Sequence, residues 1–360
     1  MLKIKITQTK SFKPKPKDET QLGFGKYFTD HMFLMDWDAK RGWHDARIEP
    51  YHSFQLDPCA GVFHYGQEVF EGIKAYRTKD DRILLFRPWD NAERFQKSAE
   101  RMCIPPVLQS DFIDGIKALI QIDRDWIPHR FGTSLYLRPF IIATGTGFGA
   151  KASSTYRFVI IASPSGCYYE NGLEPIKVYV EDKYIRTAPG LAGYAKCGGN
   201  YAASMKSMAK ANQLGYDQVL WLDGIHHRYV EEAGSMNVFF LKDNILYTAP
   251  CEGTILDGVV RRSVITLAKE QGIETKEAHI DIDDVMKDGK DGTLQECFGT
   301  STAALIAPIG ELRYHDESVT VAGGRIGPVS QQLYGRLSGI QWGREEDPYN
   351  WTVEVAKKPA

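Results

Sequence analysis

Apolar residues recur at two different spacings in the first half of the chain, and each spacing predicts a different kind of element. Residues 91–102 and 111–122 repeat apolar positions with the period of a helix that buries one face. The pair Pro105-Pro106 lies between these segments, so the first helix is expected to end before it. Residues 134–143 and 157–162 are nearly continuous apolar runs, which are typical of well-buried strands.

Turn-forming residues fill positions 163–172, after which the pattern of elements begins again. Beyond this segment we expect strands at 177–180, 218–222, 236–241, 245–247, 294–298 and 303–307, and helices at 203–214, 259–271 and 329–337. Groups of strands with segregated helices indicate an α+β fold rather than a doubly wound one. At 360 residues the chain exceeds one ordinary core. We therefore expect an N-terminal domain at 1–162, an interdomain loop at 163–174 and a C-terminal domain at 175–360.

Composition narrows the class of protein and of partner. The formal net charge of -2 gives no reason to expect a nucleic acid or an acidic membrane as partner. The six cysteines include no Cys-x-x-Cys pair, which argues against zinc binding and dithiol chemistry. No run approaches the ~18 apolar residues of a membrane span. Scattered cysteines in a chain of this length are most often reduced core residues, so we expect a cytoplasmic protein without a metal site.

Candidate chemistry is concentrated in the segment Tyr194-Ala-Lys196-Cys-Gly-Gly-Asn-Tyr201. A lysine amine can hold an aldehyde cofactor as a Schiff base. Two glycines let the backbone approach a flat ring, and the Tyr201 hydroxyl can bond a phenolic oxygen on that ring. A lysine beside Gly-Gly is more often an ordinary surface loop residue, so this segment does not decide the function by itself.

A second segment, Glu231-Glu232-Ala-Gly-Ser235-Met-Asn237, strengthens that interpretation. Here a pair of acids leads through a small-residue turn into an apolar, strand-like run. An acid at the mouth of a buried strand is destabilising unless it has a cationic partner. A carboxylate is also what keeps a pyridine nitrogen protonated. The amine, the glycine pair, the hydroxyl and the acid together describe a site for pyridoxal phosphate.

Three further features could bind a phosphate group. The segment Asp257-Gly-Val-Val-Arg261 predicts a helix start, with Asp257 as a candidate cap and with free amides in the first turn. Residues 298–303 predict a hydroxyl-rich turn between two strands. Arg94 offers a fork of charge-assisted hydrogen bonds. Each of these signals is weak when taken alone.

Taken together, the motifs resemble those of the branched-chain amino-acid aminotransferases, members of the class IV family of pyridoxal-phosphate enzymes. The resemblance runs from about Phe24 to the C-terminal helix. Besides the segments above, it rests on Phe24-Gly-Lys-Tyr-Phe-Thr-Asp-His, His64-Tyr65, Phe70-Glu-Gly-Ile-Lys-Ala-Tyr, Leu85-Phe-Arg-Pro-Trp-Asp-Asn, Tyr136-Leu-Arg138-Pro and Gln218-Val-Leu-Trp-Leu. It implies the fold type IV architecture, with a smaller N-terminal domain, a larger C-terminal domain with a β-barrel-like core, and the site at the domain interface.

The resemblance also implies a role for each candidate residue. Lys196 would form the Schiff base with pyridoxal 5'-phosphate and carry a proton between the substrate α-carbon and the cofactor C4′. Glu232 would pair with the pyridinium nitrogen, and Tyr201 would bond the ring O3′. The residues implied as phosphate ligands are Arg94, Val259, Val260 and Thr302. Those implied as lining the substrate site are Phe24, Tyr65, Phe70, Tyr136, Arg138, Tyr168, Ser235 and Ala303.

The implied reaction is the reversible transfer of the amino group of L-leucine, L-isoleucine or L-valine to 2-oxoglutarate. The aromatic residues of the site would form an apolar slot suited to branched side chains. Arg138 lies in an apolar strand, and a buried guanidinium needs an anion. The second carboxylate of glutamate or 2-oxoglutarate would supply it, and hydroxyls such as that of Tyr65 would otherwise hold Arg138.

Three further implications concern assembly and regulation. The family forms homodimers in which a loop, here the one that carries Phe148, reaches the neighbouring site. Tyr168 would belong to a mobile cover. The redox Cys-x-x-Cys of the mammalian mitochondrial members would fall at Ala304 and Ala307, so no thiol switch is expected.

Two other interpretations stay open at this point. Another class IV enzyme, a D-amino-acid aminotransferase or an aminodeoxychorismate lyase, would share Lys196, Tyr201 and Glu232. A nonenzymatic binding protein would use Lys196 as a structural residue only. A nicotinamide dehydrogenase is disfavoured, because no G-x-G-x-x-G follows a strand and opens a helix.

Overall fold

The computed structural model describes residues 2–166 and 174–355, and it divides into two compact units. Within the described residues, the first unit consists of 2–166, 195–198 and 339–355, and the second consists of 174–194 and 199–338. Residues 195–198 and 339–355 thus pack with the first unit, although by sequence they were assigned to the domain at 175–360.

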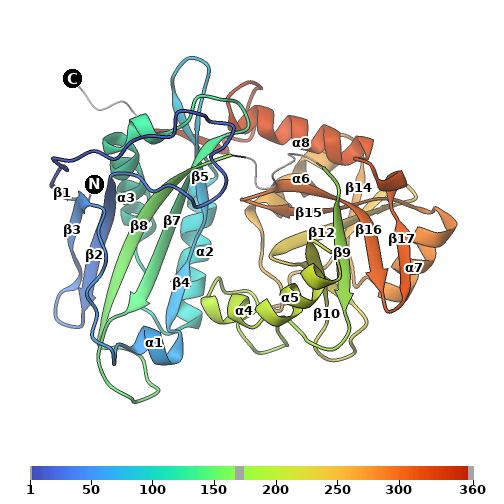
Figure 1. The fold of residues 1–360 in the computed structure, drawn as a ribbon, viewed down its shortest axis with the longest axis horizontal. Coiled ribbons are helices and arrows are strands. Elements are labelled where there is room, and N and C mark those ends of the chain that lie inside the picture. Colours follow the sequence, from blue (N-terminus) through green and yellow to red (C-terminus); the bar gives the residue numbers. More distant parts are fainter. Residues whose placement is uncertain (1, 167–173, 356–360) are drawn as a thin grey trace. The chain divides into compact units, whose positions relative to one another are not determined.

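The first unit is built on one mixed sheet (Figure 1). Its strands are β1 (Lys5–Ile6), β2 (His31–Asp38), β3 (Gly42–Pro50), β4 (Glu68–Phe70), β5 (Ile73–Arg77), β6 (Ile83–Phe86), β7 (Ser134–Ala143), β8 (Thr155–Ser165) and β18 (Thr352–Glu354). Their order is β1-β3-β2-β8-β7-β5-β6-β18, with β4 also paired to β7. The two apolar runs predicted as buried strands are confirmed as β7 and β8, which pair antiparallel along their length. Strand β18 pairs with β6, which explains why the end of the chain belongs to this unit.

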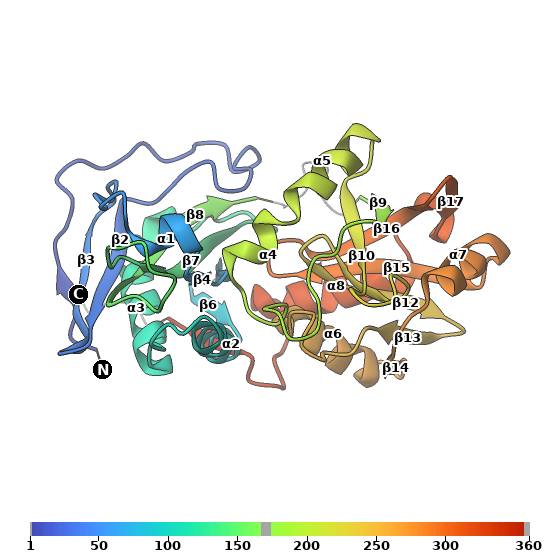
Figure 2. The ribbon, with the colours of Figure 1, turned by 90° about the horizontal axis from the view of Figure 1, so that it is seen from below.

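Two helices, α2 (Pro88–Arg101) and α3 (Gln109–Ile122), pack against each other and against this sheet (Figure 2). Both were predicted, and α2 begins earlier than expected because Pro88 occupies its first turn, where no amide is needed. The rings of Phe95, Phe112 and Phe158 meet between helices and sheet, with centroids 5.3 to 6.1 Å apart. Two short helices, α1 (Gly61–Tyr65) and η1 (Arg124–Trp126), complete the unit.

Six of the described strands in the second unit close into a barrel, in the order β11-β10-β9-β16-β15-β12 and back to β11. The strands of this unit are β9 (Ile176–Glu181), β10 (Gln218–Leu222), β11 (Val230–Ala233), β12 (Met236–Lys242), β13 (Ile245–Thr248), β14 (Glu274–Glu277), β15 (Leu294–Ser301), β16 (Leu305–Tyr314) and β17 (Glu317–Thr320). One apolar cluster that includes Val178, Leu220, Val238 and Ile309 gathers residues from the barrel strands. The expected barrel-like core is therefore confirmed.

The second half of the chain differs from the prediction in several elements, including two helices and one turn. The helices after β9 are α4 (Gly198–Ala202), α5 (Met205–Gln213), α6 (Val259–Glu270), α7 (Ile282–Asp291), η2 (Ala322–Gly324) and α8 (Pro328–Gln341). The predicted helix at 203–214 is preceded by a separate short helix, α4. Helix α7 was not predicted, because acidic residues outnumber its three buried ones. The predicted turn at 298–303 is wrong in its first half, because β15 continues to Ser301, where it still pairs with β16.

None of the helices within the described ranges combines the length and the apolar character that crossing a membrane requires.

Candidate active site

Lys196 lies in the loop just before α4, and its backbone is fixed inside the first unit. Its amide donates to Ser98 Oγ at 2.9 Å, and its carbonyl accepts from the amide of Phe70 at 3.0 Å. Close by, the amide of Gly198 donates to the Glu68 carboxylate. The Lys196 Nζ lies 4.7 Å from the centroid of the Phe70 ring, within cation–π range. These backbone contacts fix residue 196 against α2 and β4, and they therefore set where its side chain begins.

Glu71, next to Phe70, is completely buried and forms an ion pair with Arg94 of α2. Its carboxylate accepts from Arg94 Nε at 2.6 Å and Nη2 at 3.0 Å, and from Asn91 Nδ2 at 2.9 Å. Burial raises the pKa of Glu71, but the charges of Arg94 and Lys196 outweigh burial, so the pKa lies below its ordinary value. Sequence reasoning missed this residue, although it stands inside one of the motifs. Arg94, a predicted phosphate ligand, is therefore held in place by a buried acid.

The predicted aromatic wall is partly assembled around Arg138 of β7. The guanidinium carbon of Arg138 lies 4.8 Å from the Phe70 ring centroid and 5.4 Å from that of Tyr136. The Phe24 ring meets Tyr136 edge-on at 4.8 Å. The structure therefore brings four of the predicted substrate residues together, and Phe70 connects them to Lys196. Only a glycine fits at position 72, because a Cβ there would collide with the Tyr136 phenol.

Arg138 keeps hydrogen-bonding capacity for a ligand. Its Nη2 donates to the Tyr136 hydroxyl at 3.2 Å, whereas its buried Nε has no hydrogen-bond partner in the described part of the chain. The expectation that Tyr65 holds Arg138 is wrong, since the Tyr65 hydroxyl donates to the carbonyl of Phe148. Burial raises the pKa of Glu68, although the charge of Arg138 opposes this rise.

In the second unit, Glu232 of β11 is buried and meets several donors. Its Oε2 lies 3.0 Å from Arg186 Nε, and its Oε1 accepts from Asn237 Nδ2 at 3.2 Å and from the amide of Leu256 at 3.4 Å. Arg186 also donates to the carbonyl of Thr254 at 3.4 Å. The cationic partner that a buried acid requires is thus present within the chain, in a residue that the sequence analysis did not name.

Asn237 connects Glu232 to the start of α6. Its Nδ2 also donates to the carbonyl of Leu256 at 2.8 Å, and its Oδ1 fills the space that a side chain at Gly258 would need. The N-cap of α6 is Gly258, without a side-chain hydrogen bond, so the expectation that Asp257 caps this helix is wrong. The first-turn amides of a helix have no acceptor within the helix and carry its positive dipole end. The amides of Val259 and Val260 are of this kind.

Thr300 of β15 is a residue that the sequence analysis missed, since it chose Thr302 instead. Glu232, Asn237 and Thr300 are successive register partners on β11, β12 and β15. The Thr300 hydroxyl is buried and has no hydrogen-bond partner among the described atoms.

The remaining predicted residues of the second unit lie on α4 or between strands. Tyr201, Thr302 and Ala303 are half-buried, whereas Ser235 is exposed. Tyr168 lies outside the described residues.

Comparison with known proteins connects this geometry to a family. The model of the amino-transferase class IV family matches residues 68–312. The chain belongs to the class IV aminotransferases. Class IV membership makes the chain an enzyme, and it replaces the interpretation of a nonenzymatic binding protein.

Curated relatives match along nearly the whole chain. Branched-chain-amino-acid aminotransferase 2 of Bacillus subtilis is 49% identical over 355 residues, which cover 99% of this chain and 97% of the relative. Branched-chain-amino-acid transaminase 1 of the same organism is 50% identical over 353 residues, which cover 98% and 99%.

Solved structures of class IV aminotransferases share the fold. The branched-chain amino acid aminotransferase of Escherichia coli aligns with a TM-score of 0.77 and 27% identity, covering 91% of this chain and 99% of that one. The branched-chain aminotransferase of Thermoproteus uzoniensis, solved with norvaline, aligns with a TM-score of 0.74 and 25% identity, covering 90% and 100%.

Proposed function

We propose that this class IV aminotransferase transfers the amino group of L-leucine, L-isoleucine or L-valine to 2-oxoglutarate, with pyridoxal 5'-phosphate as cofactor. The observation that carries the proposal is the hydrogen-bonded connection of Glu232, Asn237 and Leu256 to the start of α6. These hydrogen bonds fix the position of the Glu232 carboxylate relative to the N-terminus of α6, where an anion can bind. A cofactor with a pyridinium at one end and a phosphate at the other requires such an arrangement. Relatives that carry the branched-chain name over the full length support the same substrates.

Residues of the second unit fit two functional groups of this cofactor, its pyridinium nitrogen and its phosphate. A pyridinium nitrogen requires a buried acid, and Glu232 is 2% exposed and forms an ion pair with Arg186 at 3.0 Å. The phosphate requires donors, which the amides of Val259 and Val260 and the hydroxyl of Thr302 would supply. When bound, the cofactor supplies an electron sink for the charge left on the substrate α-carbon after its proton is removed.

Lys196 is the residue that would hold the cofactor aldehyde and move the proton of the substrate α-carbon. Its backbone bonds to Ser98 and Phe70 fix where the amine begins, so the side chain needs little further ordering. The negative charge of Glu71 attracts the ammonium. Glu71 accepts from both Nε and Nη2 of Arg94 and so fixes the orientation of that guanidinium, which we assign to the phosphate. Tyr201 is assigned to the ring oxygen O3′.

Substrate selection is assigned to the cluster around Arg138. Phe24, Phe70 and Tyr136 offer apolar ring faces for a branched side chain, and the guanidinium offers its unused Nε–H to a second carboxylate. One surface could thus accept leucine and glutamate in turn. The other residues that we assign to the substrate site are Tyr65, Tyr168, Ser235 and Ala303.

We also propose a homodimer in which the loop bearing Phe148 reaches the neighbouring subunit's site. The Phe148 side chain is 76% exposed, which is unfavourable for a large apolar ring in a monomer, while its carbonyl is fixed by Tyr65.

We also propose that the protein is cytoplasmic. The five cysteines in the described ranges are all free thiols, which fits a reducing compartment. No nucleic acid or membrane partner is proposed.

Absorption spectra of the purified protein test the proposed function. We expect a visible cofactor band that L-leucine removes and 2-oxoglutarate restores, because the amino group passes to the cofactor and then to the oxo acid. D-Alanine serves as the control, because a D-amino-acid aminotransferase would respond to it. A band that responds to D-alanine and not to L-leucine would overturn the substrate assignment, and the absence of any band would overturn the cofactor assignment.

A further inference from the structure

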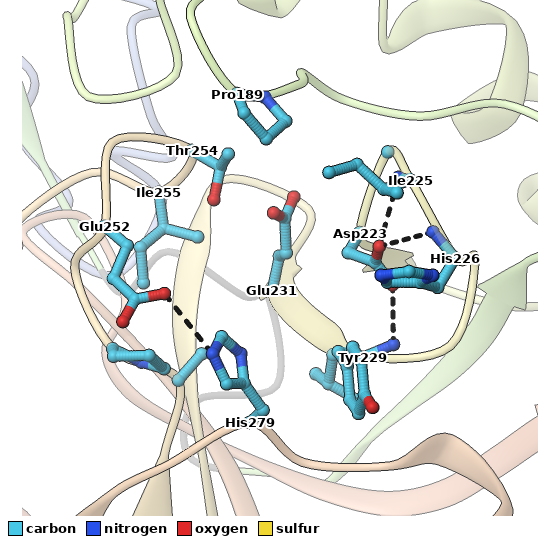
Figure 3. A pocket seen from close by; sticks show the side chains of 14 residues that line it. Pro189, Asp223, Ile225, His226, Tyr229, Glu231, Glu252, Thr254, Ile255 and His279 are labelled. Carbon is cyan, nitrogen blue, oxygen red and sulfur yellow. Dashed lines mark hydrogen bonds and ion pairs between the residues drawn. The ribbon is translucent and has the colours of Figure 1, made fainter.

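A cavity of about 250 Å³ lies in the second unit, lined by residues to which the proposed amino transfer assigns no role (Figure 3). Its wall combines the loop that follows β10, strand β11, the segment around Thr254 and Ile255, and His279. A volume of this size is enough for a small organic molecule rather than for water alone.

Glu231 directs an unused acceptor into this cavity. It precedes Glu232 on β11, and neighbouring residues of a strand point to opposite faces, so the two acids serve different surroundings. Glu231 is only 7% exposed, yet its Oε2 has no hydrogen-bond partner in the ranges that the structure describes. Figure 3 shows the carboxyl group pointing into the space between Thr254, Pro189 and Ile225. A buried carboxyl oxygen without a donor is costly unless a ligand supplies one.

The charged groups that face Glu231 come from several elements. Burial raises the pKa of Glu231 to about 7; the negative charges of Glu232 and Asp223 also raise it, and the Thr254 hydroxyl and Arg186 lower it. Asp223, from the loop after β10, is kept ionised because backbone amides, including those of His226 and Tyr229, donate to it.

Two histidines and one more acid complete the polar lining. His279 lies 3.3 Å from Glu252, and His226 stands at the edge of the Tyr229 ring. Asp223, Glu231 and Glu252 therefore place three carboxyl groups along the lining of the cavity.

Aromatic and apolar side chains line the same cavity as the Glu231 carboxyl group. The Tyr229 ring lies 5.4 Å from that of His279 and 6.0 Å from that of His226, measured between centroids. Ile225 and Ile255 add aliphatic surface. Ring faces beside an acid attract an organic cation, which can bond the carboxylate and stack at the same time.

We propose that this cavity is a binding site for a small organic cation with N–H donors, such as a guanidinium or alkylammonium group, which bonds the Glu231 carboxyl group and packs on Tyr229. The inference goes beyond amino transfer, because neither Glu231 nor Tyr229 has a role in the chemistry proposed above. The test of this site does not depend on whether the proposed amino transfer is correct.

Calorimetric titration of the full chain with methylguanidinium chloride tests the site, and methylurea is the uncharged control of the same shape. We expect one saturable event with methylguanidinium and none with methylurea. Binding should be about tenfold stronger near pH 8 than near pH 6, because a carboxyl group with a pKa of about 7 changes from mostly protonated to mostly ionised, while a guanidinium stays charged.

Glu231→Gln keeps the shape of the side chain and removes its charge, and Glu274→Gln, on the exposed edge strand β14, is the matched control. We expect methylguanidinium binding near pH 8 to weaken at least about tenfold in Glu231→Gln and to stay unchanged in Glu274→Gln. Equal binding of methylurea, unchanged binding by Glu231→Gln, or no saturable binding of methylguanidinium up to about 50 mM would each overturn the proposal.

Discussion

Glu232 shows how much of the candidate site is fixed by single side chains. Its carboxylate is shared by Arg186, Asn237 and the Leu256 amide, so both its charge and its position depend on buried partners. Neither Arg186 nor Leu256 could be chosen from the sequence, because long-range pairing decides which cation meets which acid. The acid itself could be chosen, because a glutamate that leads into a buried strand is an unusual and costly arrangement.

Glu232→Gln is expected to keep the cofactor but to lose at least about a hundredfold in turnover, because a neutral amide cannot hold a protonated pyridine nitrogen. The free energy of unfolding should fall by only about 1–3 kcal/mol, since the amide oxygen can still accept hydrogen bonds from Asn237 and from the Leu256 amide. Turnover, cofactor content and melting temperature of the same preparation check this. If the variant kept wild-type turnover and lost only stability, Glu232 would have a structural role alone and the assignment would be wrong.

Arg138→Met should separate the two substrates. Losing a charge-assisted pair of about 1.5–3 kcal/mol predicts a roughly 10- to 150-fold slower half-reaction with glutamate. The leucine half-reaction should change far less, because methionine retains apolar packing against Phe70 and Tyr136. Arg157→Met on the neighbouring strand β8 is the control, since Arg157 pairs with Asp36. Single-turnover rates with each amino acid check this, and equal losses for both would make Arg138 a structural residue.

At the scale of elements, the sequence predicted a helix best where an apolar face coincides with a residue that marks the start or end of the helix. Helix α6 was expected at 259–271 and occupies Val259–Glu270, because a glycine precedes an amphipathic run. Helix α7 was missed, because its core contact is limited to Ile282, Val285 and Met286 and its start depends on the side chain of Asp281. The turn before β16 was placed too early, because pairing with the neighbouring strands extends β15.

Gly258→Ala tests whether the start of α6 must lie against Asn237. A Cβ at this position would collide with Asn237 Oδ1, so we expect a loss of about 1–3 kcal/mol in unfolding free energy and weaker cofactor retention. Gly335→Ala is the matched control in α8, where a Cβ meets open space, and it should stabilise the protein by about 0.5–1 kcal/mol. Urea unfolding and dialysis of the cofactor measure both variants. Identical behaviour of the two variants would contradict the close approach at Gly258.

At the scale of the whole molecule, the sequence indicated α+β architecture and the barrel followed from the family resemblance, but the closure of particular strands could not be derived. Pairing of β11 with β12 completes the barrel, and it depends on contacts between segments whose local patterns are the same as in an open sheet. The local sequence pattern likewise does not predict the pairing of β18 with β6, since Thr352–Glu354 is a short, partly polar strand.

The free energy of unfolding should depend on pH in part through the protonation of Glu231. Burial raises the pKa of its carboxyl group from 4.5 to about 7, so the folded state binds this proton more tightly than the unfolded state does. The stabilising contribution is therefore present at low pH and is lost as the pH rises from about 4.5 to about 7. Relative to Glu231→Gln, the wild type should lose up to about 2–3 kcal/mol across this range and change little above it. Urea unfolding of both proteins at several pH values checks this, and a pH-independent difference between them would contradict it.

The most direct measurement is the formation of glutamate from 2-oxoglutarate by the intact enzyme, with L-leucine or D-alanine as amino donor and with Lys196→Ala as the inactive control. The account predicts steady turnover with L-leucine and none with D-alanine. It also predicts that Lys196→Ala stays folded and retains cofactor but has almost no activity, because the backbone of residue 196 is held by Ser98 and Phe70 whichever side chain it carries. Turnover with D-alanine alone, or near wild-type turnover by Lys196→Ala, would contradict it.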